Sequence, residues 1–204
     1  MKYLSLVILL VCIPAYGQSE WTLTTEKEGI KVFSKVVSDS KIKALRAECE
    51  MEATASEVVA LLLDVGAAEK WVCHTKQCNL VRKISPTELY YYAEVSLPWP
   101  LENRDFVAHM QVSEDPATHI VTVNAPAVPG IVASKKGKVR VKHSYNVWTI
   151  IPIGKNHVEL IYTLQVDPGG MIPAWIVNSF ASQGPIISFT NMRKELATGK
   201  YRGR

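Results

Sequence analysis

Two adjacent charged residues, Arg104 and Asp105, begin a long apolar segment and are the side chains in this sequence most suited to fixing a ligand. Successive side chains of a strand point to opposite faces of its sheet, so the two charges must separate. The face that holds Arg104 is the more apolar one and also carries Phe106, Ala108 and Met110. Because an unpaired buried charge is costly, a guanidinium there needs a counter-charge, a trapped water or the polar head of a ligand.

The other residue types that do chemistry are not arranged as a recognisable catalytic or metal site. The five histidines are scattered, mostly over predicted strands, and the sequence contains no nucleophile elbow, no HExxH and no paired carboxylates within one segment. Cys73 and His74 with Cys78 match no common zinc spacing. Gly169-Gly170 precedes a helical pattern and could offer amides to an anion, although a simple strand stop explains it better. We therefore expect a protein that is not an enzyme and uses no metal or cofactor.

The N-terminus has the pattern of a secretory signal. Lys2 is followed by an apolar run over 3–13 and by small residues at Ala15 and Gly17. The run is well short of the roughly 20 residues of a membrane span, so cleavage after Gly17 is a better interpretation than an anchor. We expect a signal peptide at 1–17 and a single domain at 18–204.

Secretion would place the cysteines in an oxidising compartment. Cys73 and Cys78 could then close a small loop, whereas Cys49 has the surroundings of a buried thiol. The formal net charge of +4 is too mild to indicate nucleic-acid binding. Basic residues do gather at 135–142 and 193–204, which indicates either solvated faces or weak attraction to an anionic lipid surface.

Hydrophobic periodicity predicts an α+β fold. A helix is expected at 54–65, a short helical piece at 67–71 and a long apolar-striped helix at 172–196, in which Gly184-Pro185 must produce a kink or a break. Short connections between strands indicate an antiparallel sheet. The predicted strands lie at 30–37, 42–53, 79–84, 89–97, 104–114, 119–124, 138–151 and 157–166.

A curved sheet with one long helix either packs dry or leaves a hollow between the two. Mixed polar and apolar faces favour a hollow, because a pocket for an amphiphile has apolar walls and a few polar groups. On residues alone both interpretations stay open. The side chains that would line the hollow come from three strands and the long helix, and include Tyr91, Ala93, Val95, Tyr145, Trp175 and Phe180.

Two separated motifs resemble those of the START domain, the lipid transfer module related to the steroidogenic acute regulatory protein. The first is Pro-Trp-Pro-Leu-Glu-Asn-Arg-Asp-Phe-Val at 98–107, and the second is Asp-Pro-Gly-Gly-Met-Ile-Pro-Ala-Trp-Ile-Val-Asn at 167–178. They occur in the family's order, and the resemblance covers about 21–196.

The resemblance implies a helix-grip fold, in which a curved antiparallel sheet wraps a long C-terminal helix and encloses a tunnel for one lipid. Arg104 would point into the tunnel and meet the polar group of the lipid, with Phe106, Ala93 and Val95 along the wall. The segment before the helix would act as a lid that opens at a membrane, and includes Gly169, Gly170, Ile172 and Pro173. The choline-binding aromatic cage of some relatives cannot be assembled, because Ala93 stands in the expected region.

The expected function is to bind one lipid or other apolar molecule and to carry or sequester it outside the cytoplasm, in the periplasm, as a monomer. Transient contact with an anionic membrane surface is compatible with this function, and a nucleic-acid partner is not expected. Two alternatives remain at this point. One is an enzyme of the helix-grip superfamily, a cyclase or hydrolase acting on an apolar substrate, and the other is an interaction protein with a dry core.

Overall fold

The computed structural model describes residues 20–38, 40, 42–170 and 172–203, with the backbone alone for 174, 175 and 179–182. The predicted signal peptide at 1–17 lies outside these ranges. Among the described residues, no helix has the length and apolar character needed to cross a membrane.

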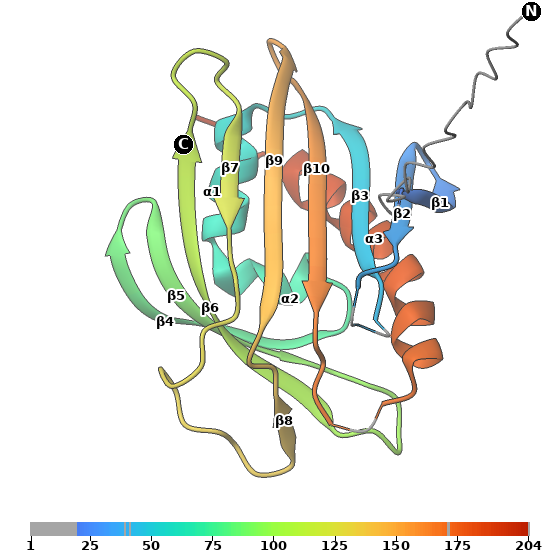
Figure 1. Cartoon of the computed structure of the whole chain (residues 1–204). Helices are drawn as coiled ribbons and strands as arrows, with labels where there is room; N and C mark the ends of the chain where they lie inside the picture. The colour runs from blue at the N-terminus through green and yellow to red at the C-terminus, as the bar shows by residue number, and fades with distance from the viewer. Residues whose placement is uncertain (1–19, 39, 41, 171, 204) are drawn as a thin grey trace, which may run out of the picture.

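A single open sheet of ten strands forms the body of the described chain, and Figure 1 shows its strong twist. Its order is β1-β2-β3-β10-β9-β7-β6-β5-β4, and every pairing along this path is antiparallel, while β8 pairs in parallel with β6. The strands are β1 (Thr22–Lys27), β2 (Ile30–Lys35), β3 (Ala44–Met51), β4 (Thr75–Ser85), β5 (Glu88–Val95), β6 (Asn103–Glu114), β7 (Val121–Asn124), β8 (Lys138–Arg140), β9 (Ser144–Gly154) and β10 (His157–Val166).

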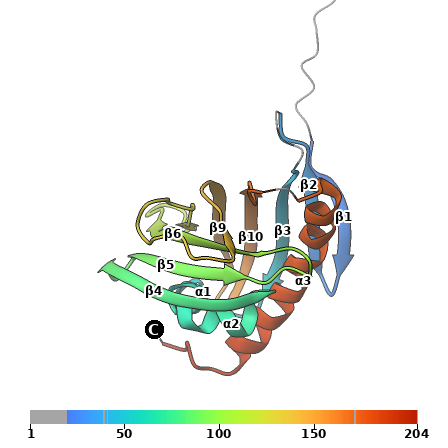
Figure 2. The ribbon, with the colours of Figure 1, turned by 90° about the horizontal axis from the view of Figure 1, so that it is seen from below.

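The helices cover one face of this sheet, as the two views in Figures 1 and 2 show. They are α1 (Ala55–Leu63), the 3-10 turn η1 (Val65–Ala67), α2 (Ala68–Trp71) and the long α3 (Ala174–Ala197). The predicted α+β helix-grip fold, a curved antiparallel sheet with a long C-terminal helix, is therefore confirmed. The strand β1 was not predicted.

Local sequence signals account for the elements that begin the domain. In β3 the alternating residues Leu45, Ala47 and Cys49 are buried, as predicted, because they face the helices. Thr54 caps α1: its hydroxyl accepts from the Glu57 amide at 3.2 Å, and the Glu57 carboxylate accepts from the Thr54 amide at 2.7 Å. This capping box satisfies two amides that the first turn would otherwise leave unpaired.

The strand predicted at 138–151 is wrong as a single element. The chain leaves the sheet at 141–143, between β8, which pairs with β6, and β9, which pairs with β7 and β10. The break changes which residues face inward: Val141 is buried, and after it the buried positions are Trp148 and Ile150. A shift of one residue moves every following side chain to the opposite face of a sheet.

The helix α3 continues across Gly184 and Pro185 rather than splitting there, and Figures 1 and 2 show that it changes direction along its length. Proline lacks an amide hydrogen and crowds the preceding turn, which explains a bend. The two halves of α3 have different neighbours. Beyond the bend, Phe189 and Met192 are fully buried in the core. The ring centroids of Phe189 and Trp148 are 5.6 Å apart.

Candidate functional site

A pocket of about 360 Å³ lies between the helix-covered face of the sheet and the first half of α3. Its walls are mostly apolar, and residues from ten helices and strands contribute to them. On the sheet side they include Val95, Phe106 and Leu164, and on the helix side Ile176 and Val177. Such a volume lies near the lower end of the range of small-molecule sites in proteins.

Most of the residues predicted to contact a ligand line this pocket. They are Tyr91, Ala93, Val95, Arg104, Phe106, Met110 and Ile172. Ala108 is fully buried in the same row of β6, as part of the adjoining core. Trp175 and Phe180 belong to α3, but their side chains lie outside the described residues.

Tyr145 is a correction, because its side chain is 55% exposed and lies on the outer face of the sheet. The reason is the break at 141–143, which gives the inward positions of β9 to Ser144, Asn146 and Trp148 instead. Asn146 therefore lines the pocket at a place where the unbroken strand would have put it outside.

Arg104 lies at one end of the pocket and is only 6% exposed. Its three side-chain nitrogens donate to backbone carbonyls: Nε to Pro168 at 3.1 Å, Nη1 to Glu102 at 2.5 Å and Nη2 to Gly169 at 2.9 Å. Within the described chain Arg104 forms no ion pair, and burial lowers the pKa of its guanidinium below the usual arginine value. Backbone carbonyl oxygens thus pair with the guanidinium, in place of the counter-charge, trapped water or ligand head group that the sequence predicts.

The segment that Arg104 holds is the predicted lid. Gly169 and Gly170 adopt φ of +63° and +66°, where only glycine is comfortable. A Cβ on Gly170 would lie 3.2 Å from Arg104 Nη2, and one on Gly169 would lie 3.3 Å from a methyl of Val139. The two glycines therefore let the chain turn sharply and press against the guanidinium, which ties the segment before α3 to the loop before β6.

The interior of the pocket carries polar groups that lack partners. The hydroxyls of Tyr91 and Tyr162 form no hydrogen bond within the described chain, and burial raises the pKa of both phenols. Nε1 of Trp71 and Oδ1 of Asn146 are also buried without a partner. Tyr162 could have been found from the alternation of β10, where it stands between the inward residues Leu160 and Leu164.

The cysteine prediction is corrected by the structure. Cys49, Cys73 and Cys78 are all free thiols. Burial raises the pKa of Cys78 to about 12, so it is a poor nucleophile. Within the described ranges, no three His, Cys, Asp or Glu side chains come together as a metal site.

The outer face of β6 carries an ionic network. Asp105 is fully buried, and both of its carboxylate oxygens accept from Arg140, at 2.7 and 2.9 Å. Glu94, which is 2% exposed, accepts from Lys138 and from Asn103. These contacts hold β8 against β5 and β6, so the wall behind the pocket is fixed from outside.

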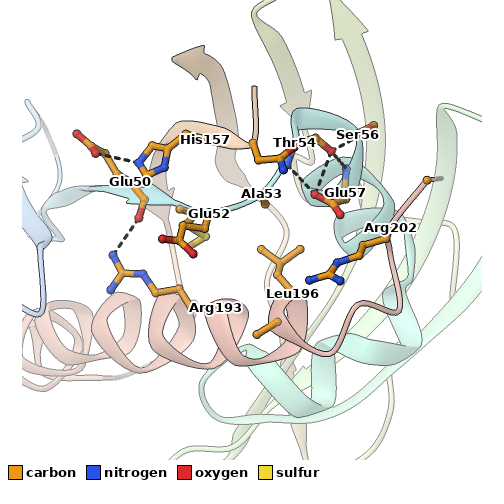
Figure 3. Close-up of a pocket in the computed structure, with 14 residues that line it drawn as sticks. Glu50, Glu52, Ala53, Thr54, Ser56, Glu57, His157, Arg193, Leu196 and Arg202 are labelled. Carbon is orange, nitrogen blue, oxygen red and sulfur yellow. Dashed lines mark hydrogen bonds and ion pairs between the residues drawn. The ribbon is translucent and has the colours of Figure 1, made fainter. Parts of the chain in front are cut away.

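A second hollow, of about 1100 Å³, lies on the surface at the far end of α3 and is drawn in Figure 3. Its charged groups are largely paired. His157 contacts Glu50 at 3.0 Å, and Arg193 donates to the carbonyls of Glu50 and Glu28 at 3.0 and 2.7 Å. These contacts tie α3 to β3 and to the β1–β2 turn, which gives this hollow a structural role.

Comparison with known proteins identifies relatives over nearly the whole chain. A family model described as START domain matches residues 14–200. An uncharacterized protein of Pseudomonas aeruginosa is 30% identical over 85% of this chain and 85% of its own length. The phosphatidylcholine transfer protein of Bos taurus is 27% identical over 84% of this chain and 81% of its own. A crystal structure of a STAR-related lipid transfer protein fragment from Xanthomonas axonopodis superposes with a TM-score of 0.80 at 33% identity, covering 87% of this chain and 98% of that one.

Proposed function

This chain belongs to the START domain family, and on that premise we propose that it binds one lipid or other apolar molecule in the pocket beneath α3 and carries or sequesters it. The observation that carries the proposal is the apolar pocket of about 360 Å³. Burial of a few hundred Å² of apolar ligand surface, at about 25 cal/mol per Å², supplies several kcal/mol of binding free energy.

The chemistry of the walls favours a carrier over an enzyme. None of the described lining residues is an aspartate or glutamate, so the pocket offers no carboxylate as a general base. The two thiols that line the pocket, Cys73 and Cys78, have their pKa raised by burial. Named relatives with full-length similarity are lipid transfer proteins.

Entry to the pocket would require the segment before α3 to move. Arg104 is the group that holds this segment, through the carbonyls of Pro168 and Gly169. We assign Arg104 the role of a clasp at the mouth, and its contact with the polar end of a ligand stays a prediction. Opening then breaks the two hydrogen bonds from Arg104 to Pro168 and Gly169, and no ion pair of Arg104.

The mouth lies at an end of the molecule suited to a membrane. Figure 1 places the β5–β6 loop, β8 and the segment before α3 together at this end. Trp99 in that loop is 93% exposed, and the exposed residues Ile131, Lys135 and Lys136 lie in the chain leading to β8. An amphipathic indole beside basic side chains suits the interface of an anionic bilayer. The predicted signal at 1–17 would place this encounter outside the cytoplasm, in the periplasm, which cell fractionation would test.

Residue Gly184 offers a clean test of binding in the pocket. It lines the pocket within α3, and a Cβ added there meets no atom within 4 Å. Gly184→Leu should fill the space and also strengthen the helix, since glycine is a poor helix former. Gly184→Ala is the matched control, because it gives the same helical benefit with little added volume.

The experiment is native mass spectrometry of residues 18–204 after incubation with a total lipid extract, followed by solvent extraction and identification of the guest. We expect a guest near one per chain for the wild type and for Gly184→Ala, and a large loss for Gly184→Leu, with all three folded by circular dichroism. A wild type that takes no guest from any extract, or a Leu variant that binds as fully as the wild type, overturns the proposal.

A further inference from the structure

Four polar side chains stand in the wall of the apolar pocket without a hydrogen-bond partner in the described chain. The hydroxyls of Tyr91 and Tyr162 and the indole N–H of Trp71 are donors, and Oδ1 of Asn146 is an acceptor. Buried polar groups in proteins are nearly always paired, because each one left alone costs free energy. The hydroxyls of Tyr91 and Tyr162 stay open to the pocket, so a ligand can supply their partner, whereas Trp71 Nε1 and Asn146 Oδ1 are enclosed by the protein.

These four side chains are neighbours around Trp148. Tyr162 stacks on Trp148 with ring centroids 4.1 Å apart, and Trp71 meets the same indole edge-on at 5.9 Å. Asn146 lies two residues before Trp148 on β9, diagonal to Tyr162 across the β9–β10 pair. Tyr91 faces the same pocket from β5, near enough to Tyr162 for a charge on one phenol to disfavour a charge on the other.

The surroundings also set the charge of the matching ligand group. Burial raises the pKa of both phenols, so both stay protonated and can donate. The cationic side chains of the lining lie at its edge: Lys43 is exposed at the surface, and Arg104 donates to three backbone carbonyls. An anion placed in the middle of the pocket would be unpaired, which is costly in an apolar site.

The volume of the pocket limits the size of the ligand. A protein cavity of about 150 Å³ holds one benzene, which is about 25 Å³ for each of its carbons. By the same ratio, a pocket of about 360 Å³ holds about 14 non-hydrogen atoms. A diacyl phospholipid has several times that number, so it would need the walls to move apart.

We propose that the ligand is a compact neutral amphiphile of about 14 non-hydrogen atoms, with a hydroxyl or carbonyl oxygen bound between Tyr91 and Tyr162. This inference rests on the proposed function and specifies its ligand class. The ligand is therefore closer to a single-chain alcohol or ketone than to a phospholipid.

The test compares three competitors of about equal size: 2-tridecanol, 2-tridecanone and tetradecane, each of about 14 non-hydrogen atoms. Each displaces the fluorescent probe N-phenyl-1-naphthylamine from residues 18–204, and the measured quantity is the preference for the oxygen compounds over tetradecane. We expect this preference to be about tenfold larger in the wild type than in Tyr91→Phe/Tyr162→Phe, which lacks both hydroxyls. Tyr145→Phe, which removes a hydroxyl from an exposed tyrosine on the outer face of the sheet, should keep the wild-type preference.

The outcomes separate this inference from the function beneath it. If all three compounds bind and the double variant keeps the same preference, the polar site is wrong and the apolar pocket stands. If neither the probe nor any competitor binds the wild type, the proposed function fails and the inference falls with it. Extraction of dioleoylphosphatidylcholine from vesicles at one molecule per chain would overturn the size limit.

A measurement without ligand checks that the variants fold. Because the hydroxyls of Tyr91 and Tyr162 lack partners in the described chain, their removal should leave the melting temperature of the protein unchanged or raise it. A clear fall in melting temperature for the double variant would mean that the hydroxyls have structural partners, which contradicts the inference.

Discussion

Arg104 and Asp105 are neighbours on β6, and the structure holds these two buried charges in opposite ways. Asp105 faces the outside of the sheet and forms a two-pronged ion pair with Arg140. Arg140 donates further to the carbonyls of Val132 and Ala133, which fixes the chain leading into β8. Arg104 faces the pocket and has carbonyl partners alone in the described chain.

The difference separates a rigid wall from an adjustable mouth. Breaking the ion pair between Asp105 and Arg140 would leave two unpaired charges buried away from water, which is strongly unfavourable in free energy. The inner contacts are hydrogen bonds to loop carbonyls, and water or another acceptor can replace each carbonyl in turn. Alternation along one strand thus lets β6 carry a fixed support on one face and a releasable clasp on the other.

The largest expected effect comes from the outer pair. Asp105→Leu leaves the Arg140 guanidinium, whose side chain is 8% exposed, without its counter-charge. We expect a loss of about 3–5 kcal/mol in the free energy of unfolding, measured by urea denaturation. The double variant Asp105→Leu/Arg140→Leu should recover much of that loss, since it leaves no uncompensated charge. Equal losses in the single and double variants would mean that the pair is not the support described here.

Acid should weaken the outer wall before the mouth. Burial alone would raise the pKa of Asp105, but the hydrogen bonds and the charge of Arg140, with smaller contributions from Tyr92 and Lys138, together lower the folded pKa. The pKa of Glu94 is lowered in the same way, chiefly by Lys138. A lowered folded pKa contributes stability that is present above the unfolded value of about 4 and is lost as pH falls through the folded value. We expect unfolding free energy, followed between pH 7 and pH 2, to fall below about pH 4 by up to about 1.4 kcal/mol per pH unit for each carboxylate.

The double variant Asp105→Leu/Arg140→Leu provides the control for that profile. It lacks one of the two carboxylates, so its slope below about pH 4 should be shallower. An unchanged slope would assign the acid sensitivity to other carboxylates.

An intermediate effect is expected at the clasp. Arg104→Leu removes three hydrogen bonds but also relieves the burial of a charge, so the loss of stability should be about 1–2 kcal/mol, smaller than at Asp105. The rate of ligand release, measured by stopped-flow displacement of N-phenyl-1-naphthylamine, should rise several-fold. For Arg104→Lys, the stability and the release rate should lie between those of the wild type and of Arg104→Leu, because an ammonium cannot span three carbonyls. If release is unchanged while affinity for an anionic amphiphile alone drops, Arg104 binds a ligand head group and is not a clasp.

Sequence reasoning predicted the elements whose signals are local. The alternation of β3 and the helix that begins after Thr54 each depend on neighbouring residues, so a single segment determines them, whereas the part of Glu57 in the capping box was not predicted. The same reasoning placed Arg104 and Phe106 on the pocket side of β6, because that strand is regular from end to end.

The errors arose where the determining contact is remote. Two of the three partners of Arg104, Pro168 and Gly169, lie more than 60 positions away in the sequence, and no local pattern predicts which distant carbonyls a guanidinium contacts. The face of Tyr145 was wrong because the strand breaks at 141–143, where Val141 turns to pair with Asp105. Because of that break, Asn146 was not predicted to line the pocket, although it is one of the few polar residues that do.

The smallest effect on stability is expected at Trp99, where a substitution also tests most directly which end of the molecule contacts a membrane. Its side chain is 93% exposed, so Trp99→Ser should change the free energy of unfolding by less than about 0.5 kcal/mol. Binding to vesicles that contain phosphatidylglycerol, measured by flotation, should nevertheless fall clearly and should weaken further as salt is added. Ile153→Ser is the matched control, because Ile153 is 49% exposed at the opposite end of the sheet. Equal losses for both variants would show nonspecific apolar adhesion, whereas a loss confined to Trp99→Ser would locate membrane contact at the end where Arg104 holds the pocket closed.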